Sequence, residues 1–477
     1  MRKNSTSICK MDMKFTFVVV GGGIAGISCV ESLHFWSENE KILLITPSSV
    51  VKVAKSAINI TRNLVDLDVG ETDVQSVFKN NDRIEIVTDF VTGLNYKDRT
   101  ITTGKNLKIL FDKLCICAGA QPNLIDESNP FVLGIRDTES VFEFQKRIAK
   151  ARKIIVVGNG GIASEIIHEV KGVEKIWVVR DEHITKTFLD PGASEFLISG
   201  LGKNNKEERS FIRRLKYEVN KKDGGKKEVT SPALGPDWHS EFELKGANET
   251  EGVKVEYGTF VASITMNKSG EWPVTVILDN GNSYEADFVV SATGVIPNSK
   301  IFAEGNEGLK IAADGGIVVD EKMETSLRDV FAAGDVCTSG WNEAQHWHQM
   351  RLWGQARQMG MYAAKCMVAS LKNEPVCQDF CFEIFTHVTK LFGFKVILLG
   401  LFNGQKLGNE YEILLRVTKG NEYVKLVLKD GRMQGAILIG ETDLEEMCEN
   451  LILNQLDLTP FGDDLLNPDI DIEDYFD

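Results

Sequence analysis

One glycine-rich stretch near the start of the chain, FVVVGGGIAGISC at residues 17–29, constrains the possible folds most strongly. Its first four residues are apolar and mostly β-branched, which predicts a buried parallel strand, and residues 24–35 predict a helix. Between them, Gly21, Gly23 and Gly26 have the spacing of a dinucleotide-binding turn, where free N–H groups at a helix N-terminus meet a pyrophosphate. A glycine turn that serves packing alone has the same spacing, but the order strand, turn and helix favours a nucleotide site.

The same pattern recurs about 137 residues further on, in VVGNGGIASE. Residues 153–157 predict a strand, and Gly158, Gly160 and Ala163 form the turn before a second helix. Two such units indicate an internal duplication, which is far more specific than either motif alone. The chain is therefore expected to bind two nucleotides.

The ribose position, at the end of the strand that follows each unit's helix, differs between the two units. In the first unit it is Thr46, where such folds usually carry an acid that binds ribose hydroxyls. In the second unit Arg180 and Asp181 stand there together. Because an arginine there accommodates a 2′-phosphate and an acid favours the bare hydroxyl, the choice between NADPH and NADH stays open.

The composition limits the class of protein. With 477 residues, of which 43% are hydrophobic and 26% charged, the chain is long enough for two or three domains with substantial cores. The net charge of −15 argues against general nucleic-acid binding, and no apolar run reaches the ~18 residues of a membrane-spanning helix. Nine cysteines without framework spacing favour a reducing compartment, so we expect a cytoplasmic and nuclear protein without membrane attachment or direct nucleic-acid contacts.

Two stretches depart from the rest of the chain in charge. Residues 203–227, within an insertion at 201–246, hold ten Lys or Arg and four acids. They predict a mobile, solvated segment or a docking surface for an acidic or nucleic-acid partner. Near the end of the insertion, Trp238 is expected to pack rather than to act chemically. The tail at 463–477 holds seven acids and no basic residue, which predicts a disordered or partner-bound end.

Five motifs follow one another along the chain: GGGIAG, FDKLCICAGAQP, VVGNGGIASE, ADFVVSATGVIPN and TSLRDVFAAGD. A long helix is expected after the last of them, at about residues 345–372. In this order the motifs resemble the pyridine nucleotide–disulfide oxidoreductase family. The resemblance implies an α/β fold with two Rossmann-like domains, one for FAD and one for NAD(P), and a small C-terminal α+β domain. The implied parts are a flexible N-terminus at 1–14, an FAD-binding domain at 15–150 and 298–372, an NAD(P)-binding domain at 151–297, a C-terminal domain at 379–462 and the acidic tail.

The resemblance also assigns site residues. By resemblance, Gly21, Gly23 and Gly26 hold the FAD pyrophosphate, Asp335 bonds to the ribityl chain, and Gly119 and Gly294 mark the crossings between the domains. Ala25, Thr46, Lys52 and Gly334 are further candidate FAD residues, although Thr46 stands where the family carries an acid. Those implied to bind NAD(P) are Gly158, Gly160, Ala163, Glu165 and Arg180, with Glu165 near the nicotinamide. Lys52 and Glu165 are the two residues expected to take part in catalysis. The histidines show no metal-ligand spacing, so no metal site is expected.

Residues 50–60, VVKVAKSAINI, depart from the family pattern. Related reductases carry a C-x4-C pair or a single cysteine there, facing the flavin, whereas this stretch has no cysteine. Lys52 and Lys55 are the polar groups available instead, each either facing the flavin or being a solvated surface charge. Four cysteines elsewhere lack C-x-x-C spacing and are expected to be buried and structural: Cys115, Cys117, Cys377 and Cys381.

The resemblance and this departure together predict an FAD-dependent NAD(P)H oxidoreductase without the redox-active cysteine pair. Electrons would pass from NAD(P)H through the flavin to an acceptor such as oxygen, a quinone, a small oxidant or a protein. The alternative is a slow-turnover redox sensor that binds FAD and NAD(P)H and protects a partner from oxidation. By resemblance, that partner would be a tRNA ligase complex.

Overall fold

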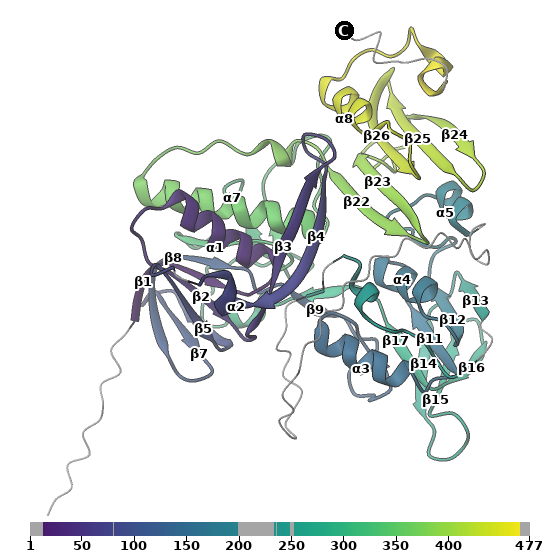
Figure 1. Ribbon diagram of the computed structural model, residues 1–477, viewed down its shortest axis with the longest axis horizontal. Helices are drawn as coiled ribbons and strands as arrows, with labels where there is room; N and C mark the ends of the chain where they lie inside the picture. The colour runs from purple at the N-terminus through teal and green to yellow at the C-terminus, as the bar shows by residue number, and fades with distance from the viewer. Residues whose placement is uncertain (1–12, 80, 199–232, 235, 249–251, 468–477) are drawn as a thin grey trace, which may run out of the picture.

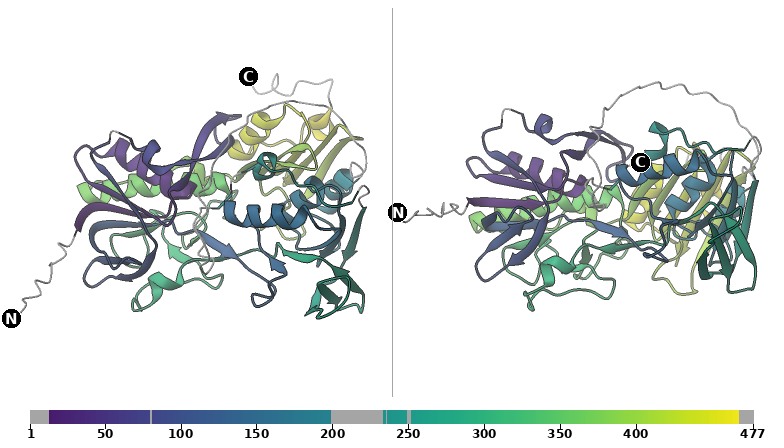
Figure 2. Two further views of the ribbon diagram at one scale, coloured as in Figure 1. Left: turned by 60° about the horizontal axis from the view of Figure 1, so that its bottom comes forward. Right: turned by 90° about the horizontal axis from the view of Figure 1, so that it is seen from below.

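The computed structural model describes residues 13–79, 81–198, 233–234, 236–248 and 252–467, which fold into three units (Figure 1). The first unit stands on one side, and the second and third lie together on the other (Figure 2). The predicted α/β fold with two Rossmann-like domains and a small C-terminal α+β domain is confirmed. Three predicted segments lie wholly or largely outside the described residues: the start of the N-terminus, the basic part of the insertion and the end of the acidic tail.

A mixed sheet organises the first unit, in the strand order β5-β2-β1-β8-β7-β6 with β20 beside β8. Its parallel strands are β1 (Met13–Val20), β2 (Ile42–Thr46), β5 (Ile84–Thr88), β8 (Lys108–Ile116) and β20 (Val330–Ala332). The antiparallel strands β6 (Val91–Asn95) and β7 (Thr100–Thr103) complete one edge. All five residues of β2 are buried, as expected for a parallel strand covered on both faces. The carboxyl ends of the parallel strands meet at one edge, where the glycine turn follows β1.

Two helices pack together on this sheet, although they lie far apart in the sequence. α1 (Ile24–Trp36) follows the glycine turn, and α7 (Trp353–Lys372) belongs to the end of the unit. A Cβ added to Gly360 of α7 would stand 2.1 Å from the carbonyl oxygen of Ala25, so the helices approach backbone to backbone. The predicted start of this helix near residue 345 is wrong, because the backbone at Leu352 is extended (φ −130°, ψ 151°) and the helix begins after it.

The second unit repeats the arrangement with a five-stranded parallel sheet, in the order β10-β17-β11-β12-β13. Its strands are β10 (Val132–Leu133), β11 (Lys153–Val157), β12 (Glu174–Val179), β13 (Gly252–Tyr257) and β17 (Phe288–Ser291). α4 (Gly161–Glu169) follows β11 as α1 follows β1, and α3 (Thr138–Ile148) and α5 (Pro191–Ile198) also belong to this unit. A small antiparallel sheet completes it, with β14 (Val261–Met266), β15 (Val274–Leu278) and β16 (Ser283–Ala286).

Short pieces connect the first two units. β9 (Ala120–Pro122) and β18 (Val295–Pro297) pair antiparallel where the chain crosses from one unit to the other and back. After the return come α6 (Lys300–Ala303) and the parallel pair β19 (Ile317–Val319) and β21 (Cys337–Ser339). Gln121 of β9 and Ile296 and Pro297 of β18 line the cavity described below.

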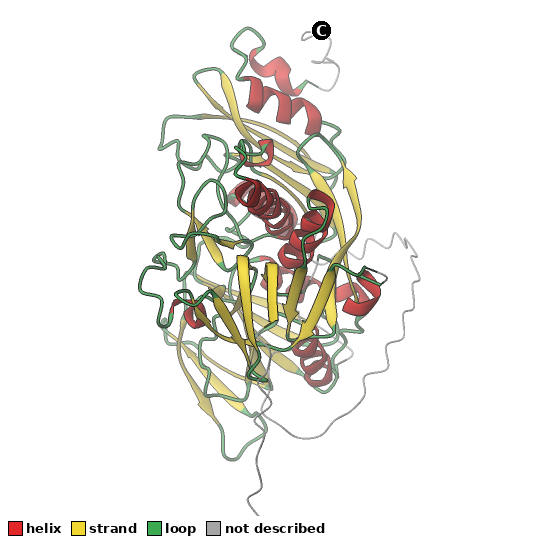
Figure 3. Ribbon diagram, turned by 90° about the vertical axis from the view of Figure 1, so that its left-hand side faces the viewer, coloured by secondary structure: helices red, strands yellow, loops and turns green. Residues whose placement is uncertain are grey.

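The third unit is an antiparallel sheet in the order β22-β23-β26-β25-β24, seen at the top of Figure 3. Its strands are β22 (Thr386–Leu391), β23 (Phe394–Gly400), β24 (Glu412–Thr418), β25 (Glu422–Lys429) and β26 (Arg432–Ile439). α8 (Glu445–Asn454) packs on this sheet through Met447, Leu451 and Ile452, which join the buried cluster of the unit.

A long hairpin of β3 (Val50–Asn59) and β4 (Val65–Asp73) reaches from the first unit to the third (Figure 1). At its tip, the backbone and side-chain amides of Asn63 donate hydrogen bonds to Glu449 of α8, at 3.2 and 3.0 Å. The hydroxyl of Thr386 donates to the carbonyl of Asn63 at 3.0 Å. The stretch that lacks the family cysteines is therefore one strand of a connection between the two units.

Two further observations bear on the predictions. β1 begins at Met13, inside the N-terminus predicted to be flexible up to residue 14, because Met13 and Lys14 pair with Ile109 and Leu110 of β8. Within the described ranges, the structure has no helix that is both long and apolar enough to cross a membrane.

Candidate functional site

A cavity of about 580 Å³ opens at the carboxyl edge of the first sheet, a volume within the range of cofactor pockets. The predicted FAD residues that line it are Gly21, Gly23, Ala25, Thr46, Lys52, Gly119 and Asp335. Gly26 and Gly334 lie behind this lining, close to Gly21 and Ala25 respectively, and Gly294 lies exposed where β18 begins. The structure thus gathers most of the predicted FAD residues around one space.

The glycine turns of the two units have the same geometry. Gly21 has φ +119°, and an added Cβ would stand 2.1 Å from the carbonyl oxygen of Cys117. Gly158 has φ +135°, and a Cβ there would stand 2.1 Å from the carbonyl oxygen of Ala292. The helices that follow have glycine N-caps, Gly23 and Gly160, without a side-chain hydrogen bond. Their first N–H groups are therefore available to a phosphate group.

Asp335 supplies a carboxylate to the cavity directly after β20. Among the described residues, no donor hydrogen-bonds to this carboxylate. Burial raises the pKa of Asp335 above its usual range, while the nearby Arg136 and Arg351 act in the opposite direction. A half-buried carboxylate without a protein partner is expected to find its donors on a ligand. The hydroxyl groups of FAD are such donors, so the residues present fit the predicted cofactor.

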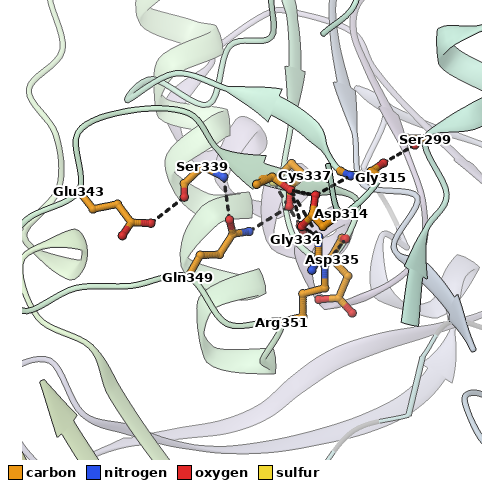
Figure 4. A network of polar contacts seen from close by, with 12 residues as sticks. Ser299, Asp314, Gly315, Gly334, Asp335, Cys337, Ser339, Glu343, Gln349 and Arg351 are labelled. Atoms are coloured by element: carbon orange, nitrogen blue, oxygen red, sulfur yellow. Dashed lines mark hydrogen bonds and ion pairs between the residues drawn. The ribbon is translucent and has the colours of Figure 1, made fainter. Parts of the chain in front are cut away.

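A polar network holds the turn that presents Asp335 (Figure 4). Arg351 donates from Nε to the main-chain oxygen of Asp335 at 2.9 Å and forms a 2.7 Å ion pair with Asp314. Gln349 donates to the carbonyl of Cys337 at 3.0 Å and accepts from the N–H of Ser339 at 2.7 Å. The extended segment before α7, which was predicted to be helical, thus positions the carboxylate.

Lys52 lies on β3 at the wall of the cavity, with only 6% of its side chain exposed. Its Nζ forms a 2.7 Å ion pair with Glu71 of β4, and Glu71 also accepts a hydrogen bond from Thr138 of α3. The interpretation of Lys52 as a solvated surface charge is therefore wrong. The cation faces the cavity and is balanced by one carboxylate.

Within the described part of the chain, Cys117 is the cysteine that lines this cavity. Its Sγ lies 3.5 Å from that of Cys115, and both residues are buried, as predicted. The hydrogen bond with Cys115 and burial raise the pKa of the Cys117 thiol well above its usual range, which makes it a poor nucleophile. The prediction of burial is wrong for Cys377, which is exposed in the segment between α7 and β22, and Cys381 is only partly buried.

The second unit carries a separate set of polar groups beside its glycine turn. Asn159 donates to Asp181 at 3.0 Å, and Lys186 forms a 2.9 Å ion pair with the same carboxylate. Although burial acts in the opposite direction, these two contacts hold the pKa of Asp181 below its usual range. Arg180 is exposed beside it. The ribose position thus presents both an acid held by two side chains and an exposed guanidinium, so the geometry does not choose between NADH and NADPH.

Glu165 lies one turn into α4, close behind Gly160 and Ala163. The indole N–H of Trp238 donates to Glu165 Oε2 at 2.6 Å. Burial raises the pKa of Glu165 above its usual range, against the opposing effects of the Trp238 hydrogen bond and of His239. Trp238 is buried, as expected of a packing residue, but its indole also holds the carboxylate that was predicted to lie near the nicotinamide.

Sequence analysis missed several residues that line the cavity. Asp89 and Phe90 follow β5, and their position after a parallel strand was an available signal. Arg136 and Trp353 also line the cavity, but neither was predicted to bind a cofactor. Arg136 precedes the capping box of α3, in which Asp137 accepts from the N–H of Ser140 at 2.8 Å and so fixes the backbone beside it.

The sequence matches the family described as pyridine nucleotide-disulphide oxidoreductase over residues 15–209 and 225–360. The chain belongs to this family. The resemblance read from the five motifs is thereby confirmed, as are FAD and NAD(P)H as the cofactors that the family uses. Residues 387–456 of this family member match a second description, the rubredoxin NAD+ reductase C-terminal domain, and correspond to the third unit.

Two similar proteins extend the match to nearly the whole chain, and both are named pyridine nucleotide-disulfide oxidoreductase domain-containing protein 1. The one from Drosophila melanogaster is 48% identical over 98% of this chain and 100% of its own length. The one from Danio rerio is 47% identical over 97% of each chain. Among solved structures, the water-forming NADH oxidase from Lactobacillus brevis, bound to NADH, has a TM-score of 0.66 at 17% identity. It covers 94% of this chain and 92% of its own, which supports the fold.

Proposed function

We propose that this oxidoreductase binds FAD in the 580 Å³ cavity and passes electrons from NAD(P)H to an acceptor outside its own chain. The observation that supports this most directly is the Lys52–Glu71 ion pair on the hairpin, where related reductases carry cysteines facing the flavin. FAD, when bound, supplies the chemistry by taking a hydride from NAD(P)H and giving up electrons to an acceptor.

The residues of the chain would hold and orient the two cofactors. The turn at Gly21 and the start of α1 would bind the FAD pyrophosphate, and Asp335 would accept hydrogen bonds from the ribityl hydroxyls. The turn at Gly158 and the start of α4 would bind the nicotinamide nucleotide. Glu165, whose pKa is raised by burial against the opposing effects of Trp238 and His239, would lie beside the nicotinamide.

The cysteine at the cavity wall limits the choice of electron acceptor. Cys117 stays protonated beside Cys115, so a dithiol relay through the wall is disfavoured. Oxygen, a quinone, a small oxidant or a redox protein would then have to receive the electrons.

A second candidate is a slow-turnover sensor that binds the same cofactors and protects a partner from oxidation. One observation favours it: the Trp238 indole already donates to Glu165 Oε2, so a nucleotide that needs this carboxylate would have to displace an aromatic side chain first. The sequence resemblance suggests a tRNA ligase complex as that partner.

Rapid-mixing kinetics separates the two candidates. We expect NADH or NADPH to bleach the flavin of the purified protein anaerobically, and a small acceptor to restore the colour over many cycles. Bleaching without repeated turnover, together with stable binding to a partner protein, would favour the sensor instead.

A further inference from the structure

A short segment after the insertion, described at residues 233–234 and 236–242 and called here the strap, runs between the first and second units. It begins at the 580 Å³ cavity proposed above to bind FAD, called here the flavin cavity, where Ala233 is part of the lining. The N–H of Leu234 donates to the carbonyl of Arg136 at 2.7 Å, and the carbonyl of Leu234 accepts from the indole of Trp353 at 2.7 Å. Leu234 and Trp238 are buried, so the strap is packed into the structure rather than lying on it.

The far half of the strap is fastened to the second and third units. Trp238 donates to Glu165 of α4 at 2.6 Å, and Asp237 lies 3.4 Å from Lys390 of β22. Asp237 itself has φ +53°, a left-handed conformation that is unfavourable for a residue other than glycine. Phe242 packs edge to face on Phe142 of α3, with ring centroids 5.3 Å apart. The strap thus crosses the molecule from the flavin cavity to the helix of the second glycine turn.

A nicotinamide nucleotide bound at the second glycine turn would pass this place. A pyrophosphate held at Gly158 and Gly160 would lie at the start of α4, and Glu165 lies one turn further along the same helix. Glu165 shares a second, small cavity with Trp353, and Trp353 also lines the flavin cavity. Trp353 is therefore shared by the surroundings of Glu165 and by the flavin cavity. On the α4 side, the Trp238 indole already occupies one oxygen of the Glu165 carboxylate.

We propose that the strap fills the nicotinamide position when no nucleotide is bound, with Trp238 as its latch, and that NAD(P)H must displace the Trp238 indole to reach the flavin. The proposal rests on the proposed function, because it concerns the reductive half of that reaction. Nucleotide binding then competes with the closed strap, and the apparent Kd is the intrinsic Kd divided by the fraction of molecules with the strap open.

Two substitutions of the latch test this in the FAD-loaded protein. Trp238→Phe keeps the ring but removes the N–H donor, and Trp238→Ala removes both. We expect Trp238→Ala to lower the Kd for NAD+ or NADP+ about tenfold and to speed anaerobic flavin reduction at subsaturating NADH or NADPH by a similar factor, with Trp238→Phe in between. Trp272→Phe is the matched control, because Trp272 stacks on Arg152 of the second unit, with the Arg152 Cζ 4.0 Å from the ring centroid.

The outcomes separate the strap from the function it rests on. Suppose that nucleotide binding is unchanged or weaker in both Trp238 variants while the wild-type flavin is still reduced. That result would contradict the strap proposal and leave the proposed oxidoreductase function supported. A wild-type flavin that neither nucleotide reduces, together with tighter nucleotide binding by Trp238→Ala, would overturn the function and support the strap.

A measurement on the wild-type protein covers the case in which the Trp238 variants fold poorly. Hydrogen exchange at the N–H of Leu234, which the strap protects through its bond to Arg136, should become faster when NAD+ or NADP+ is added to the FAD-loaded protein. Slower or unchanged exchange with bound nucleotide would mean that the strap stays in place, and would overturn the proposal.

Discussion

Lys52 and Glu71 form a 2.7 Å ion pair across the two strands of the β3–β4 hairpin, at the wall of the flavin cavity. The two side chains are 6% and 21% exposed, so neither charge is well solvated. A buried charge that loses its partner is costly, whereas removing both charges together costs less. The pair therefore combines two roles: it closes the cavity wall and keeps a balanced cation beside the site.

A double-mutant cycle measures this pair. We expect Lys52→Met to lower the free energy of unfolding by about 2–4 kcal/mol, because the Glu71 carboxylate is left without its cation. Adding Glu71→Gln should recover part of the loss, which gives a coupling energy of about 1–3 kcal/mol in urea unfolding. Strictly additive single substitutions would show that the pair contributes no interaction of its own.

Gly21→Val should expel FAD. A side chain at this position has to adopt φ +119° and collides with the carbonyl oxygen of Cys117, so the turn that meets the pyrophosphate cannot form. Gly93→Val is the matched control, since a Cβ at Gly93, in the same sheet, meets no atom within 4 Å. The measurement is the molar ratio of FAD to purified protein. A Gly21→Val protein purified with full flavin would show that the Gly21 turn does not bind FAD.

Asp335→Ala should weaken FAD binding by about 1.5–3 kcal/mol, the usual contribution of a hydrogen bond to a charged group. In the Kd this is a rise of roughly ten- to 150-fold. Asp335→Asn keeps the shape and one acceptor oxygen, so its Kd should lie between those of the wild type and Asp335→Ala. An unchanged FAD dissociation constant in both variants would mean that the carboxylate faces the cavity without touching the cofactor.

Asp190 and Lys425 provide a prediction about pH. Asp190, directly before α5 of the second unit, pairs with Lys425 on β25 of the third unit at 2.5 Å, and the Lys425 side chain is only 4% exposed. Although burial acts in the opposite direction, Lys425 holds the pKa of Asp190 below its usual range. A carboxyl with a depressed folded pKa stabilises the protein above its unfolded pKa of about 3.9, and this stabilisation is lost as the pH falls through the folded value.

Asp190→Asn should therefore cost about 3 kcal/mol of unfolding free energy at pH 7, since Lys425 is left buried and unpaired. The difference between wild type and variant should stay constant from about pH 7 to pH 5 and shrink below about pH 4. Denaturant unfolding across this range is the measurement. If the difference in unfolding free energy between wild type and Asp190→Asn grew on acidification, the Asp190–Lys425 ion pair would not be its source.

The parts of the fold that depend on local sequence were predictable. Gly21 and Gly158 each follow an apolar strand and precede a helix, so the two nucleotide units and their order follow from spacing. Asp335 and Gly119, further along the cavity lining, were expected only from the resemblance to a family. The start of the helix after Asp335 was not predictable in the same way. Residues 345–352 have helical composition, but tertiary contacts of Arg351 and Gln349 hold them extended.

Contacts between distant residues account for what was missed. Asn63 meets Glu449 only because the hairpin reaches the third unit, and nothing in the sequence around either residue indicates the other. Trp238 is a second example, because its burial was expected but its hydrogen bond to Glu165 was not. Arg136 lines the cavity because the capping box of α3 fixes the backbone beside it. No cofactor-binding motif predicted this role.

Anaerobic titration of the purified protein with NADH and with NADPH tests the central claim most directly. The account predicts a protein that is yellow from bound FAD and loses this colour on adding at least one of the two nucleotides, without any change in its count of free thiols. A colourless protein that takes up no FAD, or a flavin that neither nucleotide reduces, would contradict it.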